Sequence, residues 1–203
     1  ATAYLWSDNG TGTNQTASGT TAGAYTVLVT DLNNCSNTAT GSLTVNMIPT
    51  VSVNSEVVCS DAGAVTFTAT SGTATDYLWS VNGSGVLATT SGTAAGAYTV
   101  LVTDANNCTN TATGTFTVNT IPTLSVNDAT ICSDAGAVIF TATSGTAIDY
   151  FWSGNGSGTG STTSGMADGD YTVRVTDANS CTNTATGTLI VNTIPVVSVN
   201  DET

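Results

Sequence analysis

The sequence contains no lysine and no histidine, and Arg174 is its only basic residue. Against this single base stand 14 acidic residues, which give a formal net charge of −13 at pH 7. Proteins bind nucleic-acid phosphates and anionic membrane surfaces mainly through Lys and Arg. We therefore expect no nucleic-acid partner and no direct insertion of this segment into a membrane.

Proline is scarce as well, and its three occurrences are evenly spaced. Ile48-Pro49, Ile121-Pro122 and Ile194-Pro195 follow one another at a step of 73 residues (121 − 48 = 194 − 121 = 73). The same step separates Tyr4, Tyr77 and Tyr150, then Cys35, Cys108 and Cys181, and also Cys59 and Cys132. Self-similarity at a fixed period marks a tandem array of structural modules.

Each repeat is long enough to be a small domain with its own core. Residues 50–122 and 123–195 differ at only 19 of their 73 positions. We predict complete repeats at 50–122 and 123–195, a partial repeat at 1–49 that lacks its N-terminal strands, and the start of a further repeat at 196–203. Because this frame starts and stops within a unit, we expect a segment of a longer array.

The missing bases also remove most catalytic chemistry. A Ser, Thr or Cys nucleophile is ordinarily activated by a histidine or lysine, and neither occurs here. The closest pair of acids, Asp168 and Asp170, occurs only in the third copy, where the second copy has Ala95 and Ala97. We predict that the chain is not an enzyme, that it has no catalytic residues and that it binds no organic cofactor.

Threonine, valine, glycine and asparagine dominate what is present, a mixture typical of strands and turns. In residues 50–122, apolar and threonine positions alternate, Asn82-Gly83 gives a hairpin signal, and Tyr98 after a glycine resembles the tyrosine corner of Ig-like sandwiches. We predict an all-β fold, a tandem array of small Ig-like antiparallel β-sandwiches. The expected aromatic core residues are Tyr77, Trp79 and Tyr98, and in the next copy Tyr150, Trp152 and Tyr171.

Five cysteines in so short an all-β array predict disulfides and an oxidising, extracellular setting. Without lysine, Lys–Asn isopeptide bonds are excluded as the alternative covalent support. Three connectivities are open. Bonds within a repeat, Cys59–Cys108 and Cys132–Cys181, are favoured because each domain then closes on itself. Neighbour bonds, Cys35–Cys59 and Cys108–Cys132, are the second option, and Cys59–Cys181, which would join consecutive repeats, is the third.

Other patterns have a functional and a structural interpretation. Asp31, Asp104 and Asp177 occupy the same turn of each copy and are weak calcium candidates, although a single Asp at a strand end ordinarily caps its own turn. The N-x-Ser/Thr triplets that contain Asn-Gly are better explained as hairpin turns than as glycosylation sites. The threonine row of residues 109–117 is one row, whereas ice binding requires several coplanar rows.

Three stretches of the chain together resemble the Ig-like repeats of large Bacteroidetes surface proteins such as SprB-like gliding adhesins. These stretches are YLWSVNG, AGAYTVLVTDANNC and VCSDAGAVTFTA. The resemblance covers every repeat. It implies export, often by type IX secretion, a role as surface stalk, adhesin or filament, and one disulfide within each domain, Cys59–Cys108 and Cys132–Cys181.

The sequence therefore predicts a non-enzymatic structural stalk or filament segment of a secreted, repetitive cell-surface adhesin. Its expected partners are the neighbouring repeats and other copies in a filament. In this hypothesis the short Ile-Pro linkers hold neighbouring domains at a nearly fixed angle, with Ile121 buried between them. The alternative is a glycan- or protein-binding Ig-like module, in which Val86–Thr90, together with Asp168 and Asp170, would contact the ligand.

Overall fold

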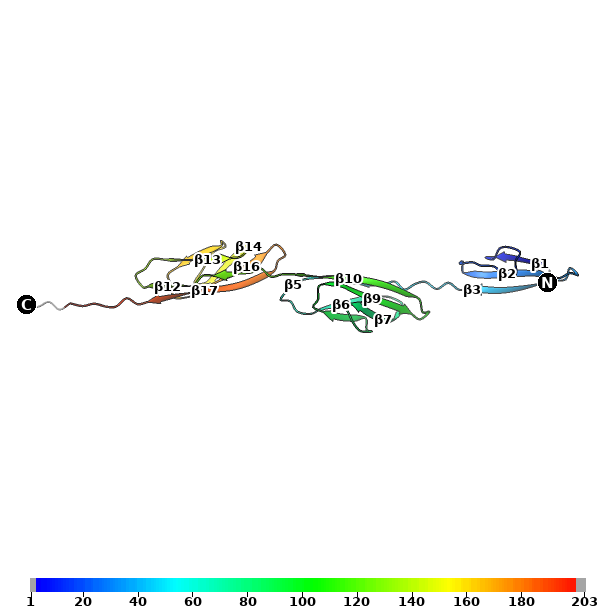
Figure 1. Ribbon diagram of the computed structural model, residues 1–203, viewed down its shortest axis with the longest axis horizontal. Coiled ribbons are helices and arrows are strands. Elements are labelled where there is room, and N and C mark those ends of the chain that lie inside the picture. Colours follow the sequence, from blue (N-terminus) through cyan, green and yellow to red (C-terminus); the bar gives the residue numbers. More distant parts are fainter. Residues whose placement is uncertain (1–2, 200–203) are drawn as a thin grey trace, which may run out of the picture. The chain divides into compact units, whose positions relative to one another are not determined.

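The computed structural model describes residues 3–199, which contain strands and turns but no helix (Figure 1). The all-β prediction is confirmed: several small sheets pair into about three Ig-like sandwich domains in tandem. The start of the further repeat predicted at 196–203 lies partly outside the described residues. Within residues 3–199, no helix has the length and apolar character needed to cross a membrane.

The first repeat contributes a single three-stranded antiparallel sheet. Its strands are β1 (Ala3–Asp8), β2 (Gly23–Thr30) and β3 (Ser36–Leu43), paired in the order β1-β2-β3. The apolar residues of β2 alternate with threonines, which gives the strand one face suited to a core and one suited to water.

The second repeat consists of two sheets. The four-stranded sheet has the order β5-β10-β9-β7 and the three-stranded sheet the order β4-β6-β8. The strands are β4 (Ser52–Val53), β5 (Glu56–Cys59), β6 (Val65–Thr70), β7 (Ala74–Val81), β8 (Thr89–Gly92), β9 (Gly96–Asp104) and β10 (Thr109–Asn119).

The third repeat has the same strand order in both of its sheets, β12-β17-β16-β14 and β11-β13-β15. Its strands are β11 (Ser125–Val126), β12 (Ala129–Cys132), β13 (Val138–Thr143), β14 (Ala147–Gly154), β15 (Thr162–Gly165), β16 (Gly169–Asp177) and β17 (Thr182–Asn192). The matching orders follow from the matching sequences.

One strand pair in each complete repeat is parallel. In the second repeat β5 lies beside the end of β10, with Glu56 opposite Phe116 and Cys59 opposite Asn119. In the third repeat β12 lies beside the end of β17 in the same register, with Cys132 opposite Asn192. This pairing fixes the end of the domain at which each first cysteine lies.

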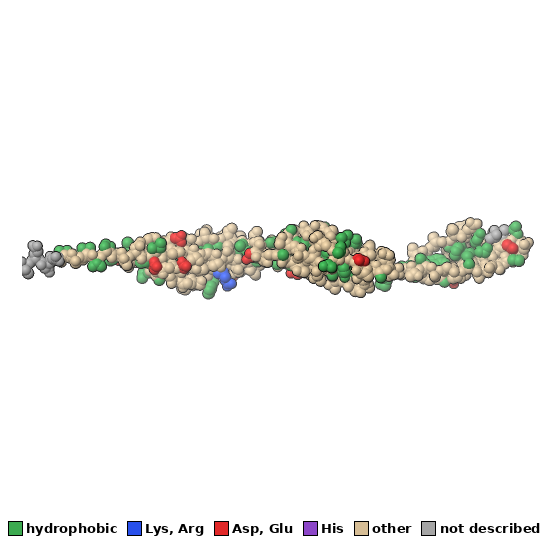
Figure 2. Space-filling model, turned by 90° about the horizontal axis from the view of Figure 1, so that it is seen from below, with side chains coloured by type: hydrophobic (Ala, Val, Ile, Leu, Met, Phe, Trp, Pro, Cys, Tyr) green, Lys and Arg blue, Asp and Glu red, His purple; other side chains and the backbone are tan. Residues whose placement is uncertain are grey.

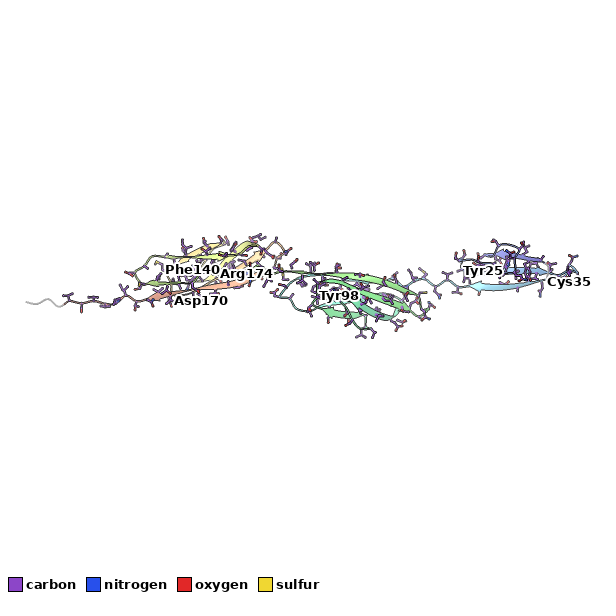
Figure 3. The ribbon with its side chains drawn as sticks, in the orientation of Figure 1. Tyr25, Cys35, Tyr98, Phe140, Asp170 and Arg174 are labelled. Carbon is purple, nitrogen blue, oxygen red and sulfur yellow. A yellow bond between two sulfur atoms is a disulfide. The ribbon has the colours of Figure 1, made fainter. Side chains whose placement is uncertain are left out.

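The sandwich core is built around a stacked pair of aromatic rings. The ring of Phe67 lies 4.0 Å from that of Tyr98, and the ring of Phe140 lies 4.1 Å from that of Tyr171 (Figure 3). Trp79 and Trp152 are also buried, with exposed fractions of 4% and 2%. Each pair joins the two sheets across the core.

Two of the expected core residues lie nearer the surface than predicted. Tyr77 and Tyr150 are half-buried, although each shares a strand face with a buried tryptophan two residues later. Both occur near the start of their strand, towards the end of the sandwich, where the facing sheet covers less of the ring.

The tyrosine corner forms in all three copies. The hydroxyl groups of Tyr25, Tyr98 and Tyr171 donate hydrogen bonds to the backbone carbonyls four residues upstream, at 2.9, 3.0 and 3.1 Å. A Cβ atom added at Gly92 would lie 2.0 Å from the Tyr98 hydroxyl oxygen, so only glycine leaves room for the ring there.

Candidate functional site, a disulfide between consecutive repeats

A disulfide joins Cys59, at the end of β5, to Cys181, just before β17. The two cysteines are 122 residues apart in sequence, and their Cα atoms are 5.6 Å apart. Cys59 belongs to the second repeat and Cys181 to the third, so the bond links one repeat covalently to the next. Cys35, Cys108 and Cys132 are free thiols.

This pairing corrects the favoured prediction of bonds within each repeat, Cys59–Cys108 and Cys132–Cys181. Cys59 lies opposite Asn119 at one end of β10, whereas Cys108 directly precedes Thr109 at the other end. Eleven residues of strand separate Cys108 from Asn119 (119 − 108 = 11), which corresponds to about 36 Å. A disulfide requires Cα atoms within about 7 Å, so the two cysteines of one repeat cannot meet.

The Cys59 side of the bond is positioned by the parallel pair β5–β10. Directly after Cys59, the Ser60 amide donates a hydrogen bond to the Asn119 carbonyl at 2.8 Å. The Ser60 hydroxyl oxygen accepts a hydrogen bond from the Ile121 amide at 3.2 Å. Ser60 therefore holds both the last residue of β10 and the linker that follows it.

The Cys181 side is positioned by the turn between β16 and β17. Asp177 Oδ1 accepts hydrogen bonds from the amides of Asn179 and Cys181, each at 2.9 Å, and the Asp177 amide donates to the Cys181 carbonyl at 2.9 Å. Ser180 completes the turn in a left-handed conformation, with φ of 64°. The turn places Cys181 with no exposed surface.

The Ile121-Pro122 linker is also held from the third repeat. The side-chain amide of Asn183 donates a hydrogen bond to the Pro122 carbonyl at 2.9 Å. The Cys181 sulfur lies 4.0 Å from the Asn119 carbonyl oxygen. Pro122 is fully buried and Ile121 only half-buried, so the proline, not the predicted isoleucine, is the buried residue of the linker.

The same hydrogen bonds recur at the other linkers. Asn110 donates to the Pro49 carbonyl at 2.8 Å, as Asn183 does to Pro122. Ser133 donates from its amide to Asn192 at 2.8 Å and accepts from the Ile194 amide at 3.3 Å, as Ser60 does with Asn119 and Ile121. Each linker therefore has the contacts that accompany the disulfide, whether or not a cysteine pair is present.

The calcium candidates serve as turn caps. Asp31 Oδ1 accepts from the amides of Asn33 and Cys35 at 2.8 and 2.9 Å, and Asp104 makes the same pair of bonds with Asn106 and Cys108. Among the described residues no group of three or more His, Cys, Asp or Glu side chains could hold a metal ion. The carboxylates thus stabilise the cysteine-bearing turns.

Asp168 and Asp170 bind the neighbouring strand rather than each other. Asp168 Oδ1 accepts from the Val191 amide at 2.8 Å, and Asp170 Oδ1 accepts from the Thr188 hydroxyl at 3.1 Å. Both therefore fasten β17 to the start of β16 in the third repeat, which their sequence position alone did not reveal.

The variable stretch Val86–Thr90 is anchored from inside the sandwich. The buried Trp79 indole donates to the Leu87 carbonyl at 2.9 Å, and Trp152 and Trp6 make the same bond in the other copies. Thr90 is buried and donates to the Ser84 carbonyl at 3.0 Å. Val86 and Leu87 are 69% and 70% exposed, which leaves two apolar side chains on a fixed loop.

A cavity of about 440 Å³ lies on the inner face of the first repeat's sheet. Its lining includes Trp6, Tyr25, Val27 and Leu43. In the second repeat the equivalent tyrosine, Tyr98, stacks on Phe67, but no residue in the described part of the chain takes this place beside Tyr25. The cavity is therefore the uncovered core face of a sandwich, whose lining is typical of domain packing.

Surface charge is sparse. Figure 2 shows one face of the molecule covered mostly by uncharged polar side chains, with scattered acidic groups and a single basic one. The face offers no basic patch of the kind that binds phosphates.

No protein-family model and no curated protein matches the sequence. Among solved structures, the chain is similar to extracellular domains 3–5 of Drosophila OTK (14% identity, 84% of this chain and 71% of that chain, TM-score 0.40). It is also similar to the I-band fragment I67–I69 of titin (14%, 84% and 75%, 0.41). A third similar structure is that of a bacterial ice-binding adhesin (20%, 84% and 74%, 0.38).

Sequence reasoning missed the residues that hold the linker. Ser60 and Asn183 make no motif, but each recurs after 73 residues, as Ser133 and as Asn110 respectively. Their partners lie 61 residues away in sequence, at the opposite end of the same repeat. The signal was a polar residue repeated directly beside a cysteine or close after one.

Proposed function

We propose that the chain is a structural stalk or filament segment of a secreted, SprB-like cell-surface adhesin, and that it is not an enzyme. In this function repeated sandwiches, joined by short and firmly held linkers, project a distal site away from the cell. The observation that carries the proposal is the Cys59–Cys181 bond, because it ties one repeat to the next instead of closing a domain on itself.

The extracellular setting is supported by the same bond. Disulfides persist in oxidising compartments and are rare in the reducing cytosol. The partners proposed are neighbouring repeats and other copies in a filament. Nucleic acid is not proposed as a partner, because a net charge of −13 with one base leaves no cationic surface for phosphates. An electrophoretic assay with DNA and RNA at physiological salt should show no shift.

A stalk requires stiff joints, and stiffness can be measured at the linker. Spin labels attached without cysteine chemistry at Thr89 and Thr162, which are exposed equivalents on β8 and β15, report the distance between the two repeats. We expect a narrow distance distribution by pulsed electron paramagnetic resonance.

Two changes test the cause of this stiffness. Cys59→Ser removes the bond, and replacement of Ile121-Pro122 by Gly-Gly removes the fixed φ of proline. We expect each change alone to broaden the distribution and the combination to broaden it most. A distribution that is already broad in the unchanged chain would show that the repeats are flexibly tethered and would contradict the stalk function.

A second candidate function is direct binding of a protein partner, and the exposed pair Val86 and Leu87 favours it. The third repeat has Thr159 and Gly160 at these positions, so the pair is a feature of one copy only. The double change Val86→Thr and Leu87→Gly makes the second copy match the third without altering the core. Loss of adhesion to a host or cell surface in this variant, with an unchanged spin-label distance, would assign the binding function to this loop.

A further inference from the structure

The disulfide gives the chain a covalent route that is much shorter than its backbone. Cys59 and Cys181 are bonded, so residues 60–180 form a closed loop of 121 residues outside that route. We propose that tension along the chain passes from Cys59 directly to Cys181, and that the two complete sandwiches are thereby shielded from it.

The loop holds nearly all of the structure that could unfold. It contains β6 to β10 of the second repeat and β11 to β16 of the third. Both stacked ring pairs, Phe67 with Tyr98 and Phe140 with Tyr171, lie inside it. Force applied to the ends of the chain therefore has no covalent path through either aromatic core.

The strands that remain on the route are already extended. Tension enters through β4 and β5, which end at Cys59, and leaves through β17, which begins directly after Cys181. A strand rises about 3.3 Å per residue, and a fully stretched chain reaches at most about 3.6 Å per residue. Stretching these strands further lengthens the molecule very little.

The bond also changes how force acts on the parallel pair β5–β10. Without the bond, tension enters the second repeat through β5 and leaves through β10, so it pulls these parallel neighbours in opposite directions. Residues Glu56–Cys59 would then be sheared from Phe116–Asn119. With the bond, β5 is held at its far end by Cys181, so this shear is not applied.

The folded surroundings protect the bond from reduction. Cys181 has no exposed surface and Cys59 is half-buried. Thiol–disulfide exchange requires access of a thiolate to one sulfur atom. Resistance to extension should therefore last as long as the turn Asp177–Cys181 stays folded over the bond, and it should be lost in a reducing medium.

The inference deepens the proposed stalk function, on which its biological use rests, but the experiment tests the route itself. The full chain is held by peptide tags at both ends and stretched in a single-molecule force clamp, in the background Cys108→Ser with Cys132→Ser. In the oxidised state we expect extension to stop at the length of 82 residues, 1–59 and 181–203, or about 270–300 Å.

Addition of a phosphine reductant should then release the loop. The bond takes up two electrons and two protons to give two thiols, and the phosphine is oxidised to its oxide with oxygen from water. The released 121 residues add about 400–440 Å. The variant Cys59→Ser, stretched without reductant, should reach the full length directly, which checks that the limit is due to this bond and not to a stable domain.

Other outcomes overturn the proposal and remain distinguishable from failure of the stalk function. Bonds within each repeat would hide 60–107 and 133–180, and they would appear in the unsubstituted chain as two releases of 48 residues each, about 160–170 Å. Extension to the full length without reductant would show that no bond carries the load. The spin-label distances would be unaffected by either finding, so joint stiffness is judged separately.

Discussion

At the scale of the residue, the three copies act as natural variants of one another. The position at the end of the second hairpin strand is left-handed in each: Asp8 with φ of 60°, Val81 with φ of 66° and Gly154 with φ of 73°. Asp and Gly tolerate this conformation, whereas a β-branched valine is an outlier there. Val81 is also 72% exposed, so burial does not repay its strain.

Replacement of Val81 by asparagine should therefore stabilise the second repeat by about 1 kcal/mol, because asparagine relieves left-handed strain without the entropy cost of glycine. Urea unfolding is followed by Trp79 fluorescence in a background with Trp6 and Trp152 changed to Phe. Leu78→Asn, an exposed site of the same strand, serves as the control and should not stabilise. Equal midpoints for V81N and the background would show that no strain is stored at Val81.

The tyrosine corner gives a second prediction at this scale. Tyr98→Phe removes a buried hydroxyl that donates to the Ala94 carbonyl, and the lost hydrogen bond should cost about 1–1.5 kcal/mol. The half-buried Tyr77 offers a matched control, since Tyr77→Phe should change the unfolding free energy by less than about 0.5 kcal/mol. The same fluorescence assay applies, and two equal losses would show that the corner bond has no special role.

At the scale of the element, the sequence was sufficient for the strands but not for the bond between them. Alternation placed Val100 and Val102 in the core and the threonines of β10 outside, since the period of a strand determines its faces. Cysteine pairing depends on which ends of two strands meet. Only the parallel register of β5 with β10 shows that Cys59 and Cys108 lie at opposite ends of one domain.

The half-buried Tyr77 illustrates the same limit. Its position in the alternation is that of Trp79, so a pattern argument assigns both to the core. How far the facing sheet extends over each ring is a tertiary property that no periodicity encodes. The linker contacts of Ser60 and Asn183 were missed for the same reason, because hydrogen bonds between opposite ends of a domain leave no local motif.

The connectivity itself is the prediction that belongs to this scale. Non-reducing digestion and mass spectrometry should recover a peptide pair that contains Cys59 and Cys181, with Cys108 and Cys132 alkylated as free thiols. A closed loop of this size contributes up to about 5 kcal/mol to stability in the chain-entropy model. Cys59→Ser should therefore lower the unfolding midpoint, while Cys108→Ser, at an unbonded equivalent of Cys181, should leave it nearly unchanged.

At the scale of the whole molecule, the repeat period determines what the free cysteines are. Cys132 is the equivalent of Cys59 and Cys108 that of Cys181, each shifted by 73 residues. Ser133 holds the Ile194-Pro195 linker as Ser60 holds Ile121-Pro122. Each free thiol thus occupies a position that is bonded at the joint between the second and third repeats, which predicts the same bond at every joint of an array.

A lengthened chain tests this directly. A further copy of residues 123–195 is placed after Pro195, and the protein is oxidised in a glutathione redox buffer. We expect Cys132 to bond to the new copy's equivalent of Cys181, because the new linker contacts match those at Ile121-Pro122. The number of disulfides should rise from one to two while the number of free thiols stays at three, since Cys35, Cys108 and the new copy's first cysteine remain unbonded. If the new copy's two cysteines bond to each other and Cys132 stays alkylated, the Cys59–Cys181 bond is a local feature of one joint and the array has no continuous covalent linkage.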